Sequence, residues 1–565
     1  MIKKIAALII LILLCMPIQS VKAWTIPQTT LQIAKDAGLA CVPNNKTVRV
    51  GIGNQTFSSY VWDKVSIYGT GEFEVYSGKD YINTYDASNV INISISGRTF
   101  ILSDAEGNEI IKASGPIKFN SYFGFIGING LKRGGKDAVY RGEIELVFAK
   151  DGYFHVVNSL DVEDYLRGVV PNEMPVHFGL EALKAQAVAA RNYVLSPRVK
   201  ANPNYDVVDS VASQVYYGAN TEKELSNKAV EETKGIVATY NGEMILALYS
   251  STAGGYTESY ENAFSDPKTR KFPAEPKPYL KARPDFEHFC TLDNDDRAYD
   301  FYKTKPKSFD ENSRYFRWER EWTQEELQQE IQNHIAAQSA AGFVHPAVNK
   351  GEVISEILRL NVLQRGISGK IMKLEIQTEK ENYIVEKELV IRRLMTNKGK
   401  ALPSANVVFD QEFDDNGNLK SIKAYGGGYG HGVGMSQFGA GYMATNLHLP
   451  FDKILQHYYS GVALTTEPFI LSQSANQQTQ TFYSKDGKGY LIVENKGKLP
   501  YLKINVNYTE GKIDFDTTNI INKIDLSSYL QKGVNTITFN YPLEAGHNKN
   551  LKIYVEIVGK DEFNR

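Results

Sequence analysis

The chain has 565 residues, which suggests about three to four domains of ordinary size. Its 42% hydrophobic and 23% charged residues are typical of a soluble globular protein and exclude a wholly disordered chain. Because 63 Lys and Arg nearly balance 65 Asp and Glu, the overall charge gives no indication of a nucleic-acid partner.

The N-terminus resembles a secretory signal peptide. Lys3 and Lys4 precede an apolar stretch over residues 5–18, and a loose cleavage site ends at Ala23. We therefore predict a signal peptide over 1–23 and a mature chain that works outside the cytoplasm, in the cell wall or extracytoplasmic space, where nucleotide partners are not expected. An uncleaved membrane anchor is the alternative, although the stretch is shorter than the roughly 20 residues of a membrane span.

Only three cysteines are present. Cys15 lies in the apolar stretch, which leaves Cys41 and Cys290 in the body of the protein. Two cysteines in an exported protein can form a disulfide, but the sequence does not show whether these two meet.

The expected fold class is α+β. Residues 47–160 alternate apolar and polar positions in short runs, which predicts a strand-rich region. Helices are expected at about 161–169 and over 180–195. Residues 265–345 resemble an insertion, and within it Thr323 and Glu326 form a capping box that predicts a helix start.

Strands are expected again near 354–395, followed by a glycine-rich segment at 426–434 and short helices at about 436–447 and 451–459. Strand patterns over 489–494, 502–508, 535–541 and 551–558 then predict a separate C-terminal β-sandwich over 466–565. The main domain would cover 24–465, with a helical segment at 161–260 and a closing segment at 346–465.

Glu173 is the first candidate for chemistry. It lies between Pro171 and Pro175, each of which fixes its own φ, and next to apolar Met174 and Val176. Apolar surroundings raise a carboxyl pKa, as a general acid near neutral pH requires. The alternative is a glutamate on a surface loop.

The helix over 180–195 is the second candidate, because small and apolar residues cover most of its faces and predict burial. Lys184 and Arg191 lie seven residues apart, nearly in line along it. One interpretation is a cationic wall that faces Glu173 or its substrate. The alternative is that both stems extend to the surface.

The third candidate segment is GGGYGHGVGMSQ (426–437), in which six of the first nine positions are glycine. Such a segment allows close backbone approach, and it carries His431 and Gln437. It has neither the phosphate-loop spacing nor the GxSxG of a hydrolase. His431 in a glycine loop can equally be structural.

A serine nucleophile and a metal site are weakly supported. The segment YSSTAGGYTE (249–258) has three Ser and Thr hydroxyls before its glycine pair but no recognisable base partner, so it binds polar ligands or forms a turn. His288 and Cys290 are the nearest candidates for zinc ligands, and no CxxC or HExxH accompanies them. No cofactor is expected, with zinc as the weak alternative.

Taken together, these segments resemble the stage II sporulation protein D family, which includes amidase enhancers. The longest matching stretches are DVEDYLRGVVPNEMP (161–175), EALKAQAVAARNYVL (181–195), YDVVDSVASQVYYG (205–218), STAGGYTE (251–258) and GYGHGVGMSQFGAGYMA (428–444). They occur in the family's order, and the resemblance extends from about residue 48 to 462.

The resemblance implies peptidoglycan chemistry. Glu173 matches the family's catalytic acid, Lys184 and Arg191 match its helix cations, and His431 and Gln437 match its HGVGMSQ segment. Within the matching stretches we expect substrate contacts from Gln214, Ser251, Thr252 and Glu258.

The implied activity is that of a lytic transglycosylase acting on glycan strands stripped of stem peptides. Glu173 would protonate the bridging oxygen between N-acetylmuramic acid and N-acetylglucosamine. It would then take the proton of the muramic C6 hydroxyl as this group closes a 1,6-anhydro ring. Because no water is activated, a second carboxylate is not needed.

The alternative is a non-catalytic enhancer that binds wall glycan and stimulates an N-acetylmuramoyl-L-alanine amidase, the expected partner in either case. The insertion and the C-terminal domain depart from a minimal family member. For the C-terminal domain we predict carbohydrate binding or a spacer role, with simple packing as the alternative.

Overall fold

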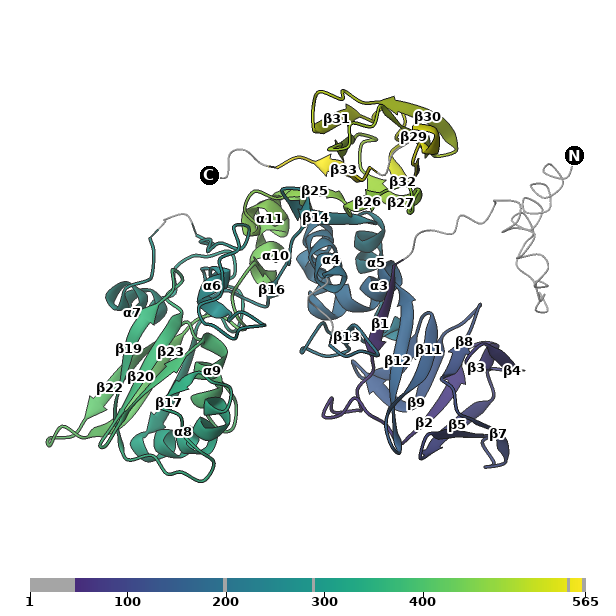
Figure 1. Ribbon diagram of the computed structural model, residues 1–565. Coiled ribbons are helices and arrows are strands. Elements are labelled where there is room, and N and C mark those ends of the chain that lie inside the picture. Colours follow the sequence, from purple (N-terminus) through teal and green to yellow (C-terminus); the bar gives the residue numbers. More distant parts are fainter. Residues whose placement is uncertain (1–45, 197–200, 287–289, 546–548, 561–565) are drawn as a thin grey trace, which may run out of the picture. The chain divides into compact units, whose positions relative to one another are not determined.

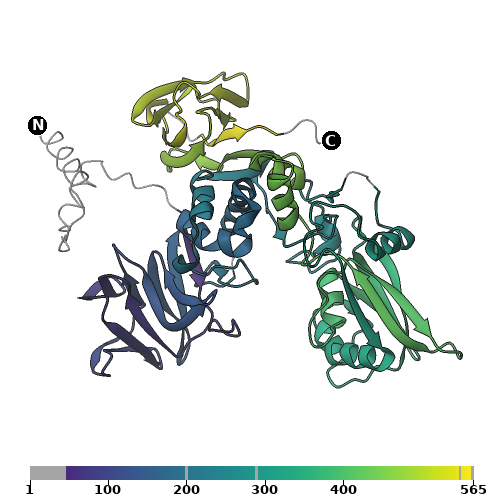
Figure 2. The same ribbon diagram turned by 180° about the vertical axis from the view of Figure 1, so that it is seen from behind.

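The computed structural model describes residues 46–196, 201–286, 290–545 and 549–560. The predicted signal peptide, Cys15, Cys41 and His288 lie outside these ranges. The described chain is a mixed α+β protein with several sheets, as expected (Figures 1 and 2). Within the same ranges, no helix has both the length and the apolar character needed to cross a bilayer.

Two antiparallel sheets form the N-terminal region, which confirms the predicted strand-rich character of 47–160 (Figure 1). The first sheet has the order β13-β1-β12-β11-β8-β3-β4, and only its β1–β13 pair is parallel. The second has the order β10-β9-β2-β5-β6-β7. The bounds are β1 Thr47–Gly51, β2 Lys64–Gly69, β3 Phe73–Ser77, β4 Asp80–Tyr85, β5 Val90–Ser96, β6 Thr99–Ser103, β7 Glu109–Ala113, β8 Ile117–Asn120, β9 Ile126–Arg133, β10 Lys136–Tyr140, β11 Glu143–Lys150, β12 Tyr153–Asp161 and β13 Val207–Val208.

A helical layer follows directly on β12. Helix α4 (Leu180–Leu195) has the predicted bounds and is largely buried. It contacts α3 (Val162–Glu173), α5 (Glu224–Glu231), α10 (Gln437–Thr445) and α11 (Phe451–Tyr458). The last two correspond to the predicted short helices.

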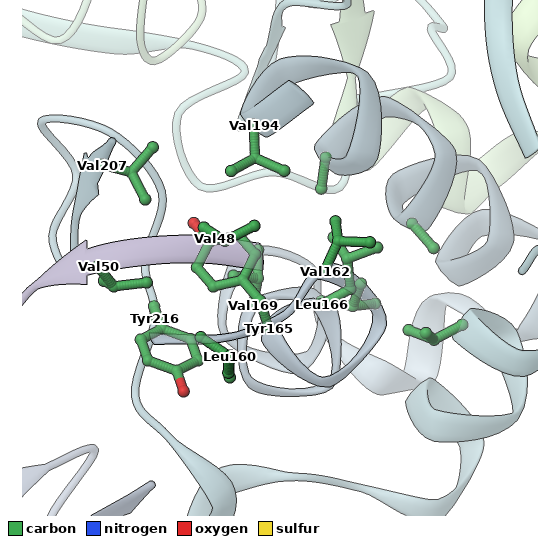
Figure 3. Close-up of a cluster of buried hydrophobic side chains, with 14 of the residues drawn as sticks. Val48, Val50, Leu160, Val162, Tyr165, Leu166, Val169, Val194, Val207 and Tyr216 are labelled. Atoms are coloured by element: carbon green, nitrogen blue, oxygen red, sulfur yellow. The ribbon is translucent and has the colours of Figure 1, made fainter. Parts of the chain in front are cut away.

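The helical layer shares one core with the N-terminal sheets. Val48 and Val50 of β1 belong to the same buried cluster as Val162, Leu166 and Val169 of α3 (Figure 3). This shared core fixes the direction in which α3 leaves the sheet, and therefore the position of its last residue.

Helix α3 runs further than predicted. It continues through Pro171 to Glu173, and the Met174 amide donates to the Val170 carbonyl at 3.0 Å. Glu173 therefore belongs to the last helical turn instead of a loop. Proline has a φ that suits a helix, but it lacks the N–H of an internal hydrogen bond and its ring crowds the carbonyl four residues earlier, so packing of α3 must favour the continuation.

Residues 267–434 contain a second core. Its sheets have the orders β17-β23-β22 and β18-β21-β20-β19. Helix α8 packs on this core and begins at the Thr323–Glu326 capping box, as predicted. Because the strands after residue 345 belong to this core, the inserted unit is longer than the predicted 265–345. The bounds are α7 Asp295–Lys303, β17 Trp318–Thr323, α8 Gln324–Ser339, β18 Val344–His345, β19 Ile357–Arg365, β20 Ile371–Thr378, β21 Asn382–Glu386, α9 Glu388–Leu394, β22 Val407–Phe413 and β23 Leu419–Gly426.

The C-terminal strands enclose a third core between two sheets. One sheet has the order β27-β32-β29-β30. In the other, β33 pairs with β26 and β28, and β28 pairs with β31. Strand β33 also pairs with β25, which pairs with β14, so this sheet continues past the boundary predicted at residue 466. The bounds are β14 Ile236–Tyr240, β25 Ala463–Thr466, β26 Phe469–Leu471, β27 Gln477–Ser484, β28 Tyr490–Glu494, β29 Tyr501–Val506, β30 Thr509–Asp514, β31 Ile521–Asp525, β32 Gly533–Asn540 and β33 Leu551–Val558.

Candidate functional site

Glu173 is the last residue of α3, and its carboxylate is bound from two sides. The backbone amide of Val215 donates to Oε1 at 2.6 Å. The Gln437 side chain forms a second hydrogen bond to the carboxylate. These contacts bring together α3, the segment that follows β13 and the start of α10.

Burial raises the pKa of Glu173 to about 7, and the hydrogen bonds from Val215 and Gln437 lower it only in part. The partial negative charge at the C-terminal end of α3 acts in the same direction as burial, because it also disfavours a carboxylate. Glu173 therefore exchanges its proton near neutral pH, which is the property expected of a general acid.

Four tyrosines are close enough to this carboxyl group for its charge to affect them: Tyr165, Tyr193, Tyr217 and Tyr249. Burial raises the pKa of each, and the charge of Glu173 raises it further. All four phenols are consequently neutral at physiological pH. Their aromatic rings are apolar, and their hydroxyl groups can form hydrogen bonds.

Gln214 orders two of these tyrosines. Its Oε1 accepts a hydrogen bond from the Tyr165 hydroxyl at 3.0 Å, and its Nε2 donates to the Tyr249 hydroxyl at 2.9 Å. Gln214 is completely buried. Gln214 therefore positions these two tyrosines, and a substrate contact by Gln214 stays a prediction.

A short parallel strand pair places Gln437. Strand β16 (Tyr249–Ser250) pairs with β24 (Met435–Ser436), and α10 begins at the next residue. The pairing needs glycine at position 434, where φ is 75° and a Cβ atom would lie 2.0 Å from the Leu248 carbonyl oxygen. The close backbone approach predicted for the glycine-rich segment is thus confirmed here.

The His431 ring forms a hydrogen bond to the backbone of Tyr249. Its Nδ1 accepts from the Val433 amide at 3.0 Å, and burial lowers its pKa to about 4. The ring is therefore neutral at pH 7. Ser251 follows Tyr249 by two residues along the chain, and its carbonyl accepts a hydrogen bond from the Phe438 amide. Substrate contacts by His431 and Ser251 stay predictions.

Thr252 and Glu258 are buried and connect chain segments. The Thr252 hydroxyl donates to Asp310. Glu258 accepts hydrogen bonds from Asn262 at 2.9 Å and from the Ser368 hydroxyl at 2.7 Å. Both side chains are completely buried, and substrate contacts by Thr252 and Glu258 stay predictions. The two side chains attach the segment after β16 to the inserted unit.

Lys184 and Arg191 do not face Glu173. Lys184 pairs with Glu181 at 2.8 Å and with Glu232 at 2.7 Å. Arg191 pairs with Glu163 at 2.6 Å and donates to the carbonyl of Ile236.

Helix geometry explains this correction. Gln186 accepts a hydrogen bond from Gln437, and Tyr193 lies seven residues further along the same stripe of α4, so this stripe faces the acid. Lys184 and Arg191 are each offset from it by two residues, or about 200° around the helix axis. The two cations therefore lie on the opposite face, and the interpretation of a cationic wall toward Glu173 is wrong.

Replacing Arg191 with Met should destabilise the protein by about 3 kcal/mol, because Glu163 and the Ile236 carbonyl lose a buried charged partner. The expected cleavage of glycan strands, divided by the amount of folded protein, should not change. Urea unfolding measures the loss, with Lys228→Met as the matched control, since that cation is 57% exposed and its removal should cost less than about 1 kcal/mol. Lost cleavage with unchanged stability would instead make Arg191 a substrate contact.

Sequence reasoning missed the tyrosines and the Val215 amide. Tyr193 could have been found from its seven-residue spacing to Gln186 along α4. Tyr217 and Tyr249 lie inside or beside motifs that were already singled out. The Val215 amide carries no signal in the sequence, because any residue other than proline has one.

A metal site finds no support in the part of the chain that the structure describes, where no group of three His, Cys, Asp or Glu side chains could hold an ion. Cys290 is exposed. The candidate site is thus a single carboxyl group in a shell of tyrosines and glutamines.

Comparisons with known proteins match two segments of the chain to family models. The family model described as "Stage II sporulation protein" matches residues 150–240, which include α3, α4 and Val215. A model described as a domain of unknown function matches residues 267–434, the unit that contains the second core.

Among curated proteins, the amidase enhancer of Bacillus subtilis is 30% identical over 309 residues, which cover 53% of this chain and 40% of that protein. An uncharacterized protein of Brachyspira hyodysenteriae is 30% identical over 365 residues, which cover 63% of this chain and 78% of that protein. Stage II sporulation protein D of Bacillus amyloliquefaciens is 28% identical over 337 residues, 56% of this chain and 78% of that protein. The chain thus spans less than half the length of the amidase enhancer.

Proposed function

The chain belongs to the stage II sporulation protein D family, which includes amidase enhancers, and on that premise we propose that it acts on the bacterial cell wall as a lytic transglycosylase. The substrate would be peptidoglycan glycan strands, probed best in peptide-free form. The exported location and the amidase partner expected from the sequence belong to the same proposal.

The observation that carries the proposal is the carboxyl group of Glu173, whose pKa burial raises to about 7. A glycosidic oxygen needs a proton as its bond to C1 breaks, and an acid with this pKa holds one near neutral pH. Of the residues that the structure describes, none with a charged side chain contributes to the shift. A single carboxyl group fits a reaction without an activated water.

The proton balance runs through one residue. Glu173 donates its proton to the bridging oxygen, which leaves as the hydroxyl of N-acetylglucosamine. The muramic C6 hydroxyl attacks C1, and its proton returns to the Glu173 carboxylate. The acid ends the cycle protonated, and the new end is a 1,6-anhydro ring. The hydrogen bonds from Val215 and Gln437 support the carboxylate between the two transfers.

Cleavage should fall as the pH rises above about 7. The first step needs the protonated form, whose fraction drops tenfold for each further pH unit above the pKa of Glu173, about 7 in this protein. Initial rates on peptide-free strands between pH 5 and 9 measure this, with substrate well below KM. A rate that rises through this range would contradict Glu173 as the acid.

Mass spectrometry of the products tests the proposal. Purified strands with and without stem peptides are incubated with residues 24–565 and with the Glu173→Gln variant. Products with anhydro-muramic ends, lighter by one water molecule than hydrolysis products and absent with the variant, are expected. Intact strands with both proteins, together with faster cleavage by an added amidase, would indicate the alternative of a glycan-binding enhancer.

The amidase enhancer of Bacillus subtilis is the relative that favours this alternative. In that case Glu173 would accept or donate a hydrogen bond to a bound sugar without turnover. The same site would be used, since Glu173 and Gln437 would contact the glycan in both cases.

A further inference from the structure

Phe57 adopts a backbone conformation that bulky residues avoid. Its φ is 57°, in the left-handed region, which is costly for a large side chain. The turn that holds it is closed by Asn54, whose carbonyl accepts from the Phe57 amide at 3.1 Å and whose side chain accepts from the Thr56 and Ser58 amides. The hydrogen bonds of Asn54 therefore hold the turn in this conformation despite the strained φ of Phe57.

The ring of Phe57 rests on a buried ion pair. The Arg133 guanidinium carbon lies 4.3 Å from the ring centroid. Arg133 donates from Nη2 to Asp209 at 2.7 Å, and both side chains are almost completely buried. A cation fixed below one face of the ring holds the ring through a cation–π contact and leaves it little freedom to tilt.

Phe57 lies next to Tyr217, one of the tyrosines around Glu173. Their ring centroids are 6.4 Å apart and their planes differ by 16°. Both rings are half-buried, so part of each remains exposed. Tyr217 is two residues after Val215, whose amide binds Glu173, so this aromatic pair lies near the acid, and the charge of Glu173 raises the pKa of Tyr217.

Asp209 connects the aromatic pair to the segment that binds the acid. Its side chain accepts a hydrogen bond from the Gly53 amide at 3.0 Å and pairs with Arg133, so it anchors the turn that contains Phe57. It also accepts the Tyr216 amide through its carbonyl. The Val215 amide that binds Glu173 lies in the same segment. The spacing between the aromatic pair and the acid is therefore built into the fold.

We propose that Phe57 and Tyr217 form a platform on which one pyranose ring of the glycan stacks, adjacent to the bond presented to Glu173. The C–H face of a pyranose is apolar and weakly positive, which matches the negative face of an aromatic ring. The platform rests on the proposed function for its ligand class. It adds a sugar-binding subsite that joins Phe57, in the turn between β1 and β2, to Tyr217, which lies within residues 150–240 matched by the family model.

Binding measurements test the platform without requiring turnover. Glu173→Gln serves as the parent, and the probe is a soluble, peptide-free glycan strand titrated by calorimetry. Phe57→Gly in this parent should weaken binding about tenfold, because the stacking face is lost. Glycine accepts a φ of 57° without strain, so the turn is expected to stay intact.

Two controls make the result specific. Phe57→Trp keeps an aromatic face at the same position and should bind like the parent. Phe123→Gly removes a ring that is 77% exposed elsewhere in the N-terminal sheets and should also bind like the parent. Circular dichroism and thermal unfolding check that each variant is folded.

Two results would overturn the platform: parental affinity in folded Phe57→Gly, or a parent that binds no glycan. Failure of the proposed lyase is a different result. If the unmodified protein leaves strands intact but binds them in a Phe57-dependent way, the platform stands and only the transglycosylase activity is contradicted.

Discussion

Glu173→Gln is expected to reduce glycan cleavage by about a hundred- to ten-thousand-fold, the usual contribution of a general acid, and at the same time to stabilise the fold at alkaline pH. The carboxyl group has a folded-state pKa of about 7 against 4.5 in the unfolded chain. Between these values the unfolded state ionises more readily, so wild-type stability falls as the pH rises through this window. Glutamine does not ionise and avoids this loss.

The gain should be near zero at pH 4 and about 2 to 3 kcal/mol at pH 8. Urea unfolding of both proteins at the two pH values measures it. Glu224→Gln is the matched control, because Glu224 is an exposed residue at the start of α5 and should leave stability and cleavage unchanged. Equal stability of wild type and Glu173→Gln at pH 8 would show that the carboxylate is not disfavoured by its surroundings.

Arg133→Met should destabilise the protein by about 3 to 5 kcal/mol, because it leaves the Asp209 carboxylate buried without its cation. Burial already raises the pKa of Asp209 to about 6 while Arg133 is present. Without the guanidinium, Asp209 should take up a proton on folding, and the Gly53 carbonyl loses its 2.6 Å hydrogen bond. Denaturant unfolding at pH 7 measures the change.

The neighbouring residue supplies the control. Lys132 pairs with Asp137 while both side chains are more than half exposed, so Lys132→Met should cost less than about 1 kcal/mol. The double variant Arg133→Met with Asp209→Asn should recover part of the loss, since it removes the unpaired charge. A cost as small as that of Lys132→Met would contradict a structural role for the buried pair.

Periodicity in the sequence predicted the helices and strands well, but it predicted their ends and their long-range contacts less well. Helix α4 has the predicted bounds, because its apolar pattern and the following Pro197 define both ends. The end of α3 was misplaced, since proline argues against a helix interior while tertiary packing of α3 on β1 favours its continuation. The pairing of β33 with β25 depends on contacts far apart in sequence, which no local pattern encodes.

Sequence reasoning singled out Glu173 and Gln437 but not the residues around them. Glu173 and Gln437 do meet. The seven-residue spacing of Lys184 and Arg191 correctly placed them on one stripe, but the spacing does not say which way that stripe faces. Their partners, Glu163 and Glu232, lie on neighbouring segments. Thr252 and Glu258 likewise occur in a motif whose role here is to join two units of the chain.

Strand β33 has a consequence for synthesis of the protein. Strand β14 pairs with β25, and β25 completes its pairing only with β33, near the end of the described chain. On the ribosome, the edge of β25 must stay unpaired until almost the whole chain has emerged, whereas the N-terminal sheets can fold much earlier. Exposed strand edges are templates for association with other chains. Nascent or C-terminally clipped protein should therefore depend on chaperones at this edge, and mature protein should not.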